Sequence, residues 1–487
     1  MTLIVGKPLT WAITATAGSG FLLFGYDQGV MAGILSGDAF TRTFPEIDTT
    51  PDGHGSSSLQ GTVVAIYEIG CFLGALVALF AGERLGRRMC IMAGCVILSI
   101  GAVLQATAYT IPHMIVGRIV AGVGNGLNTS TIPVWHSELS KAASRGKGLA
   151  IELCINIFGV MTAYWVDYGM SYVKNEAQFR FPLALQILFA IITFIGVILL
   201  PESPRWLIAH DRHNEARHIL WAIQPNAHQI SENDPVVNVD ITDITKAIVE
   251  EQAASKEGSF RAVFTNGPQR FFHRTLLGMG GQMMQQMSGV NLITYYNTVI
   301  FEKSVGMTHN LALLMAGFNG VAYFVSTFIP IWTIDRLGRR KLMLFAAAGQ
   351  CCCMAILAGT VWDGSHASGI VATVMLFLFN FFFGVGLLAI AWLWIFTFLV
   401  VEITPVSIDN IGYRTYIYFA IFNFCFLPLI YFFYPEPRNL TLEQVDLLFT
   451  GEKVKLHWHP SMGVAGDPTE RVAEGKKDPE SDVQHVE

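Results

Sequence analysis

The sequence predicts an all-α protein that spans a membrane many times, and three observations lead to that fold class. Hydrophobic residues make up 52% of the 487 residues and charged residues only 14%, and the mean hydropathy is +0.46. Apolar runs of the ~20 residues that cross ~30 Å of hydrocarbon recur along the chain. A basic motif in one loop returns half a chain later, which indicates two related halves. Such a chain is too apolar for a soluble protein of this size.

Apolar runs predict the membrane-spanning helices in order. Six lie near 9–35, 60–81, 89–111, 113–135, 148–168 and 182–200, and later ones lie near 275–301, 341–361 and 413–434. The first run is too long for the core of a signal peptide and has no small-residue cleavage site, so we expect a retained helix. All eight cysteines fall inside apolar runs, which indicates no disulfide framework of the secreted kind.

Basic residues gather on alternate connections between these runs. Short loops rich in Lys and Arg stay in the cytoplasm, and the basic connections contain Arg84, Arg87, Arg88, Lys141, Arg145, Lys147, Arg205, Arg212, Arg217, Arg336, Arg339, Arg340 and Lys341. The other connections contain little more than Arg42, Lys174, Arg180 and Lys303. With an even number of spans, both termini are cytoplasmic. The polar segment 463–487 has no apolar face and is predicted to be disordered.

The internal repeat divides the chain into two bundles. "ERLGRR" at 83–88 returns as "DRLGRR" at 335–340, and each half closes on a Pro-Glu motif, "PESPRWL" at 201–207 and "PEPRNLTLE" at 435–443. We therefore expect two parallel six-helix repeats. The predicted divisions are an N-terminal bundle (1–200), a cytoplasmic helical linker (201–272), a C-terminal bundle (273–434) and a cytoplasmic tail (435–487).

The two halves differ in length in their last third. Glu83 to Glu202 is 119 positions, whereas Asp335 to Glu436 is 101, a shortfall of 18. No charged residue occurs from Val371 to Val401. At ~1.5 Å per residue this run is ~46 Å long, more than one span and less than two spans plus a turn. The sequence thus predicts about twelve spans with a shortened region around the tenth and eleventh.

Several motifs together resemble the sugar-porter family of the major facilitator superfamily, over roughly 10–450. They are the repeated Gly-Arg loops, "PESPRWL", "GRIVAGVGNG" at 117–126 and "QQMSGVNLITYY" at 285–296. "FGYDQGVMAGIL" and "PVWHSELSKAASRGKG" look most like the fungal sugar-transporter-like branch, which includes hexose–proton and glycerol–proton symporters. The resemblance implies the major facilitator fold and a multi-pass secondary transporter of the plasma membrane. Its partners would be a small sugar or polyol, a proton and the lipid bilayer, with no nucleic acid, no cofactor and no enzymatic activity.

Asp27 is an acid in the middle of the first apolar run. Its ionised form costs ~3 kcal/mol or more at the centre of a spanning helix. Burial favours the protonated form of a carboxyl group and a nearby cation favours the ionised form, so a movable cation would switch it. The resemblance makes Arg118 that cation and the pair the proton-coupling site. The alternative is an acid that only packs two helices together through a hydrogen bond.

A sugar presents many hydroxyl groups, and amide side chains can both donate to and accept from them. The resemblance places Gln285, Gln286 and Asn291 of the seventh span on the sugar, with Asn319 on the next span and Trp392 as an aromatic lid or floor. Polar residues in spanning helices can instead hydrogen-bond only to other helices. The family usually has Gln on the fifth span where this chain has Leu153, which favours a smaller polyol or a different sugar.

Charged residues at the cytoplasmic helix ends resemble the inner salt-bridge network of the family. We expect a gating role for Glu83, Arg84, Glu138, Arg145, Glu202 and Arg205, and in the second half for Asp335, Arg336 and Arg339. The alternative is that these residues only fix the topology. No metal-ligand spacing and no catalytic constellation occurs in the sequence.

The family has a cytoplasmic loop after the tenth helix, but here Leu393 runs directly into Trp394. About twenty residues are missing relative to that pattern. Either the tenth and eleventh segments form a cramped hairpin, or they fuse into one tilted helix and the last span reverses direction. The functional prediction is proton-coupled hexose symport. The alternatives are glycerol or polyol symport, a polyol channel, a transport-impaired variant and a sugar receptor.

Overall fold

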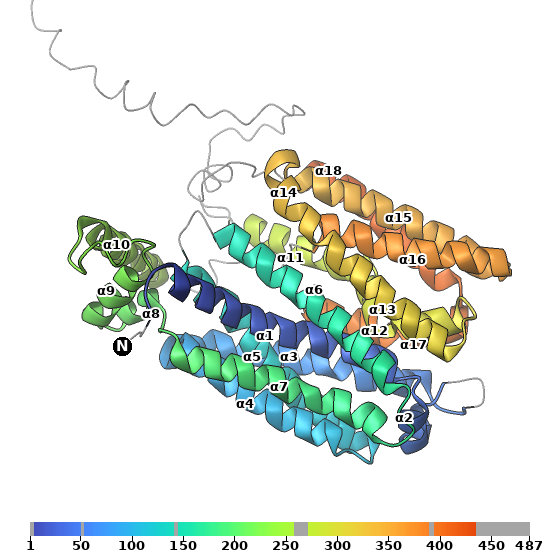
Figure 1. Cartoon of the computed structure of the whole chain (residues 1–487). Coiled ribbons are helices and arrows are strands. Elements are labelled where there is room, and N and C mark those ends of the chain that lie inside the picture. The colour runs from blue at the N-terminus through green and yellow to red at the C-terminus, as the bar shows by residue number, and fades with distance from the viewer. Residues whose placement is uncertain (1–3, 50–52, 141–144, 258–270, 389–393, 435–487) are drawn as a thin grey trace, which may run out of the picture.

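The structure, a computed structural model, describes residues 4–49, 53–140, 145–257, 271–388 and 394–434. All regular elements within these ranges are helices. Long helices run side by side in two groups, one coloured blue to green and one yellow to red (Figure 1). The all-α fold class predicted from the sequence is therefore confirmed.

Six long helices form the first bundle: α1 (Lys7–Ile34), α3 (Ser57–Leu85), α4 (Arg87–Ala106), α5 (Ile111–Leu139), α6 (Arg145–Met170) and α7 (Ala177–Leu199). Glycines let these backbones approach closely, as small residues commonly do between helices in lipid. A Cβ atom on Gly122 of α5, for example, would lie 2.3 Å from the carbonyl oxygen of Tyr67 on α3. The close packing of α3 and α5 therefore depends on glycine at this position.

Short elements cap the first bundle at both ends. The connection after α1 forms α2 (Asp38–Thr43) and the 3-10 helix η1 (Pro45–Ile47). Within the predicted linker lie α8 (Pro204–Ala209), α9 (His213–Ala222) and α10 (Pro235–Glu257). These three helices sit beside the start of α1 (Figure 1), where the Gly6 amide donates to the Ala222 carbonyl at 2.6 Å. The linker helices thus pack on the first bundle.

The second bundle contains two divided spans. The run predicted near 275–301 is not one helix, because α11 (Phe271–Met287) ends and α12 (Val290–Lys303) begins around Gly289, whose φ of 98° suits glycine. The next span divides into α13 (His309–Ser326) and α14 (Phe328–Leu337). The remaining helices are α15 (Arg339–Asp363), α16 (His366–Gly386), α17 (Trp394–Ile411) and α18 (Arg414–Phe433).

The shortened region keeps separate helices. α16 ends at Gly386 and α17 begins at Trp394, so the fused-helix alternative is wrong. Lys303 at the end of α12 pairs with Asp409 near the end of α17 at 2.8 Å. At the other end, the hydroxyl of Tyr434 donates to the Leu277 carbonyl of α11 at 2.7 Å. α18 therefore runs antiparallel to α11–α12, as a twelfth span should, and the predicted reversal is also wrong.

Eight helices of the described residues are long and apolar enough to cross a membrane by length and composition. Among the long helices outside this set, α1 and α5 carry Asp27 and Arg118. Buried polar groups occur in both sets, since Glu68 lies on α3 and Asn319 on α13.

Candidate functional site

Asp27 and Arg118 meet in the core of the first bundle. Arg118 Nη1 of α5 lies 3.6 Å from Asp27 Oδ1 of α1, and both side chains are 0% exposed. The guanidinium is positioned by α3, because Nη2 donates to the Val64 carbonyl at 2.9 Å and Cζ lies 4.6 Å from the centroid of the Tyr67 ring. The carboxyl group therefore faces neither lipid nor bulk solvent.

The ion pair is sparsely hydrogen-bonded. Neither oxygen of Asp27 has a hydrogen-bond partner among the described residues, and the same holds for Arg118 Nη1 and Nε. A buried pair is most stable when extra hydrogen bonds satisfy the remaining lone pairs and protons. Apart from the Tyr67 hydroxyl, which interacts with the Asp27 carboxyl group, this pair lacks them, so the charge supplies most of the contact between the two groups. Such a contact can open when the charge on Asp27 is removed.

Amide side chains of the divided seventh span lie together in the interior. Gln285, Gln286 and Asn291 are each no more than 5% exposed. Gln286 donates to Gln285 Oε1 at 3.3 Å, and Asn291 donates to Gln286 Oε1. The break at Gly289 places the amides of α11 and α12 together, and the structure thus groups three of the predicted substrate residues.

A second group of amides contains Asn319. Asn319 of α13 donates to Asn297 of α12 at 3.4 Å and accepts from Asn380 of α16 at 3.2 Å. Asn297 and Asn380 were not singled out in the sequence, although an Asn inside a long apolar run is a usable signal. Trp392, the predicted lid or floor, lies outside the described residues.

Gln285 also closes the end of α16. Its amide nitrogen donates to the Leu387 carbonyl at 3.1 Å and to the Leu388 carbonyl at 3.5 Å. The last carbonyls of a helix have no partner within the helix, so a side-chain donor stabilises that end. α11 rises for ~21 Å between Phe271 and Gln285 at ~1.5 Å per residue. α16 therefore ends inside the bundle, far from the level at which its neighbours reach the cytoplasmic side.

The predicted gating residues divide into those that pair and those that do not. Arg87, a residue that also resembles the inner salt-bridge network of the family, forms a two-point pair with Glu138 at 3.0 Å for both contacts. Glu202 accepts the backbone amides of Arg87 at 3.2 Å and Arg88 at 3.1 Å, at the positive start of α4. Gly86, with φ of 87°, makes this approach possible.

Three other predicted gating residues have no described ion pair. Glu83, Arg84 and Arg336 are exposed and form no ion pair within 4.0 Å with a described residue. Arg205 and Arg339 both have interactions of their own. The side chains of Arg145 and Asp335 lie outside the described part of the structure.

Two acids that the sequence analysis did not select, the buried Glu68 and the half-buried Glu402, lie at the contact between the bundles. Glu68 on α3 accepts from the Tyr295 hydroxyl of α12 at 2.5 Å, and Glu402 on α17 accepts from Thr62 of α3 at 2.7 Å. Each is an acid inside an apolar run, the same signal that marked Asp27.

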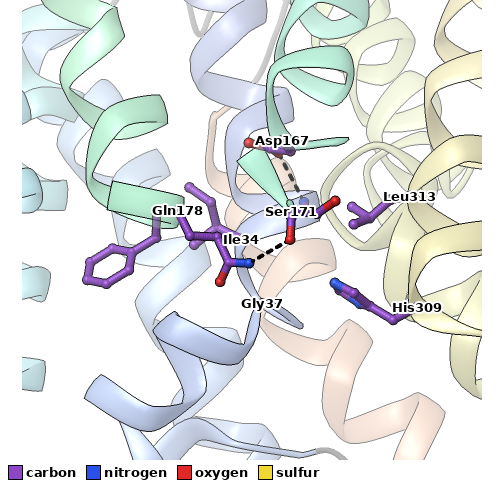
Figure 2. A pocket seen from close by; sticks show the side chains of 9 residues that line it. Ile34, Gly37, Asp167, Ser171, Gln178, His309 and Leu313 are labelled. Atoms are coloured by element: carbon purple, nitrogen blue, oxygen red, sulfur yellow. Dashed lines mark hydrogen bonds between the residues drawn. The ribbon is translucent and has the colours of Figure 1, made fainter. Parts of the chain in front are cut away.

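A small pocket lies near the outer ends of α1, α6 and α13 (Figure 2). Asp167 lies on one side, where its Oδ2 accepts the Gly33 amide at 3.2 Å. His309 points in from the second bundle and contacts Glu302 at 2.6 Å. Gln178 donates to the Ser171 carbonyl at 3.4 Å. The pocket is therefore a polar contact between the two bundles.

Two helical bundles around a buried charge pair and an amide cluster define a membrane transporter of the major facilitator superfamily. The fold matches solved structures of the xylose transporter XylE from Escherichia coli. One of these, described as a proton:xylose symporter, has a TM-score of 0.75 and 23% identity, and the match covers 91% of this chain and 100% of that one.

The sequence also matches the family model described as sugar (and other) transporter, over residues 11–394 and 387–449. The chain belongs to this transporter family, whose members are transporters and not enzymes. Saccharomyces cerevisiae sugar transporter STL1 is 37% identical over 473 residues, which cover 92% of this chain and 82% of that protein. The Aspergillus oryzae MFS-type transporter oryC is 36% identical, covering 96% and 88%.

The family match is divided in the shortened region between α16 and α17. Its two segments overlap at 387–394, where the sequence predicts a missing cytoplasmic loop. In the structure, α16 ends at Gly386 and α17 begins at Trp394. The departure from the family pattern and the early end of α16 thus fall at the same point.

Proposed function

We propose that this chain is a proton-coupled symporter that carries a sugar across the plasma membrane by alternating access. The observation that supports it most is the Asp27–Arg118 contact, a fully buried ion pair with few other partners. Two similar proteins support it: a yeast relative is a sugar transporter, and a bacterial protein of the same fold is a proton:xylose symporter.

The proton acts at the carboxyl group of Asp27. When a proton binds, Asp27 becomes neutral and no longer holds the guanidinium of Arg118, so α1 and α5 can shift relative to each other. Loss of the proton on the other side of the membrane restores the ion pair. The imposed proton gradient thus gives the cycle its direction, because each state of Asp27 favours one arrangement of the helices.

The amide cluster is the proposed sugar site. Gln286 and Asn291 bond to each other, and each can exchange that bond for a sugar hydroxyl. Asn319, Asn297 and Asn380 extend the amide surface toward α13 and α16. A hexose is the proposed substrate, and the apolar Leu153 on α6, 6% exposed, keeps glycerol as the alternative.

Transport by cells that express the chain tests this proposal. Glucose, xylose, maltose and glycerol are added one at a time to a lightly buffered suspension while the external pH is followed. A proton symporter makes the medium more alkaline with its substrate and only with its substrate. Uptake of labelled sugar without any alkalinisation would show facilitated diffusion and contradict the coupling.

A second proposal, a transport-impaired variant, rests on the early end of α16. Because Gln285 bonds to the Leu387 and Leu388 carbonyls, a sugar hydroxyl would have to compete with them for its amide nitrogen. Saturable uptake into proteoliposomes by the 487-residue chain would exclude impairment. Sugar binding without uptake would support it.

A further inference from the structure

Glu68 is a second carboxyl group in the core of the first bundle. The side chain lies on α3 and is 0% exposed. Asp27 and Arg118 both act on it electrostatically. No cation of the described residues lies within 4.0 Å of its oxygens, whereas Asp27 has Arg118 at 3.6 Å. Glu68 therefore lies beside the proton-coupling pair without being part of it.

The only described hydrogen bond to the Glu68 carboxyl group comes from the other bundle. Tyr295 of α12, itself 0% exposed, donates its hydroxyl to Oε1 at 2.5 Å. Oε2 has no hydrogen-bond partner among the described residues. Tyr295 follows the break at Gly289, so the contact joins α3 to the outer half of the divided seventh span.

Charge balance decides the state of this carboxyl group. Two acids, Asp27 and Glu68, share one guanidinium, and all three side chains are fully buried. Ionisation of both acids would leave an uncompensated buried carboxylate, which costs several kcal/mol even after relaxation. One of the two acids therefore holds a proton. While Arg118 pairs with Asp27, that acid is Glu68.

No other described group changes this balance. The titratable or charged side chains that face Glu68 from the packed helices are Asp27 of α1, Tyr67 and Cys71 of α3, Arg118 of α5, Tyr295 of α12 and, further along α3, Glu402 of α17. Arg118 is the one cation among them. The acid that is not paired with Arg118 must therefore be protonated.

We propose that Glu68 is a second proton-binding residue of the transport cycle. Through its hydrogen bond to Tyr295, the charge on Glu68 sets how tightly α12 is held against α3. This inference rests on the proposed coupling at Asp27. When a proton from outside joins the Asp27 carboxylate, Arg118 becomes available to Glu68, which gives up its own proton to the cytoplasmic side. Asp27 then passes its proton to Glu68 as the Asp27–Arg118 pair re-forms, so one proton crosses in each cycle. The core holds one proton in both states and changes the acid that carries it.

The exchange alters the contact between the bundles. A hydrogen bond to an ionised carboxylate is roughly twice as strong as one between neutral groups. Ionised Glu68 therefore holds Tyr295, and with it α12, more tightly against α3 than protonated Glu68 does. Glu68 acts here as a positioning residue for α12, through its hydrogen bond to Tyr295.

Infrared spectra of the purified protein test the protonation state without any need for transport. The parent should show the carbonyl band of a protonated carboxylic acid, which Glu68→Gln removes and Tyr295→Phe shifts. Glu402→Gln is the matched control, because Glu402 also accepts a hydroxyl across the two bundles, and it should leave that band in place. An unchanged band in Glu68→Gln would overturn the proposal.

Exchange in proteoliposomes tests the role in the cycle. Asp27→Asn should lose uphill accumulation while its sugar exchange still varies with pH, because Glu68 still titrates. Adding Glu68→Gln should remove that remaining pH dependence, and Glu68→Gln alone should lower accumulation at least tenfold. Identical pH profiles for Asp27→Asn with and without Glu68→Gln would contradict the role of Glu68. Full accumulation by Asp27→Asn would contradict the proposed function instead.

Discussion

Gly86 shows, at the scale of the residue, why the repeated Gly-Arg loops need glycine. Its φ is 87°, and an added Cβ would lie 2.7 Å from Glu202 Oε2. We expect Gly86→Ala to cost about 1–3 kcal/mol through backbone strain and to displace Glu202 from α4. Thermal unfolding in detergent measures the effect. Gly359→Ala is the control, because Gly359 has nothing within 4 Å of the added Cβ, and equal melting temperatures for the two variants would contradict the account.

The Arg87–Glu138 pair joins the start of α4 to the end of α5. Its side chains are 19% and 11% exposed and meet at two points. Glu138→Gln should weaken this contact by about 1–2 kcal/mol and speed hydrogen exchange at the start of α4. Glu215→Gln, in the exposed pair with Arg212, should change stability by no more than ~1 kcal/mol. Unchanged hydrogen exchange at the start of α4 in Glu138→Gln would show that the Arg87–Glu138 pair does not hold α4 to α5.

The end of α16 sets the prediction at the scale of the element. Gln285 donates to two carbonyls there, whereas Gln286 bonds to Gln285 and Asn291. Gln285→Ala should therefore lower the free energy of unfolding by about 1–2 kcal/mol, as well as weaken sugar binding. Gln286→Ala should weaken sugar binding with little change in stability. Thermal unfolding with and without sugar separates the two, and equal stability losses would refute the capping role of Gln285.

The sequence predicted where the spanning helices lie better than where a helix breaks within a span. Hydropathy located the spans because each needs about 20 apolar residues. It did not show that the seventh span divides at Gly289, because a glycine within a spanning helix is common and its φ is set by packing. The length deficit in the second half predicted a disturbed region correctly, but two arrangements fitted the count. The separate helices α16 and α17 exclude the fused one, and the contacts at Asp409 and Tyr434 exclude the reversal of the last span.

At the scale of the whole molecule, the site is assembled from residues that are far apart in the chain. Asp27 was predictable alone, since an acid in an apolar run is rare and costly. Its contact with Arg118 was expected from a family resemblance, not from spacing. Glu68 carried the same signal as Asp27, but its partner Tyr295 lies 227 positions away, and no local pattern reports such a contact between bundles.

We propose that a proton on Asp27 releases Arg118 and drives the two bundles between their states. Sugar accumulation against its gradient, in proteoliposomes with an imposed pH gradient, tests it most directly. We expect the parent to accumulate substrate, and Asp27→Asn to exchange substrate downhill but to reach no more than equal concentrations on both sides. Asp409→Asn, which removes an outer-end acid paired with Lys303, should accumulate like the parent. Full uphill accumulation by Asp27→Asn would contradict the account.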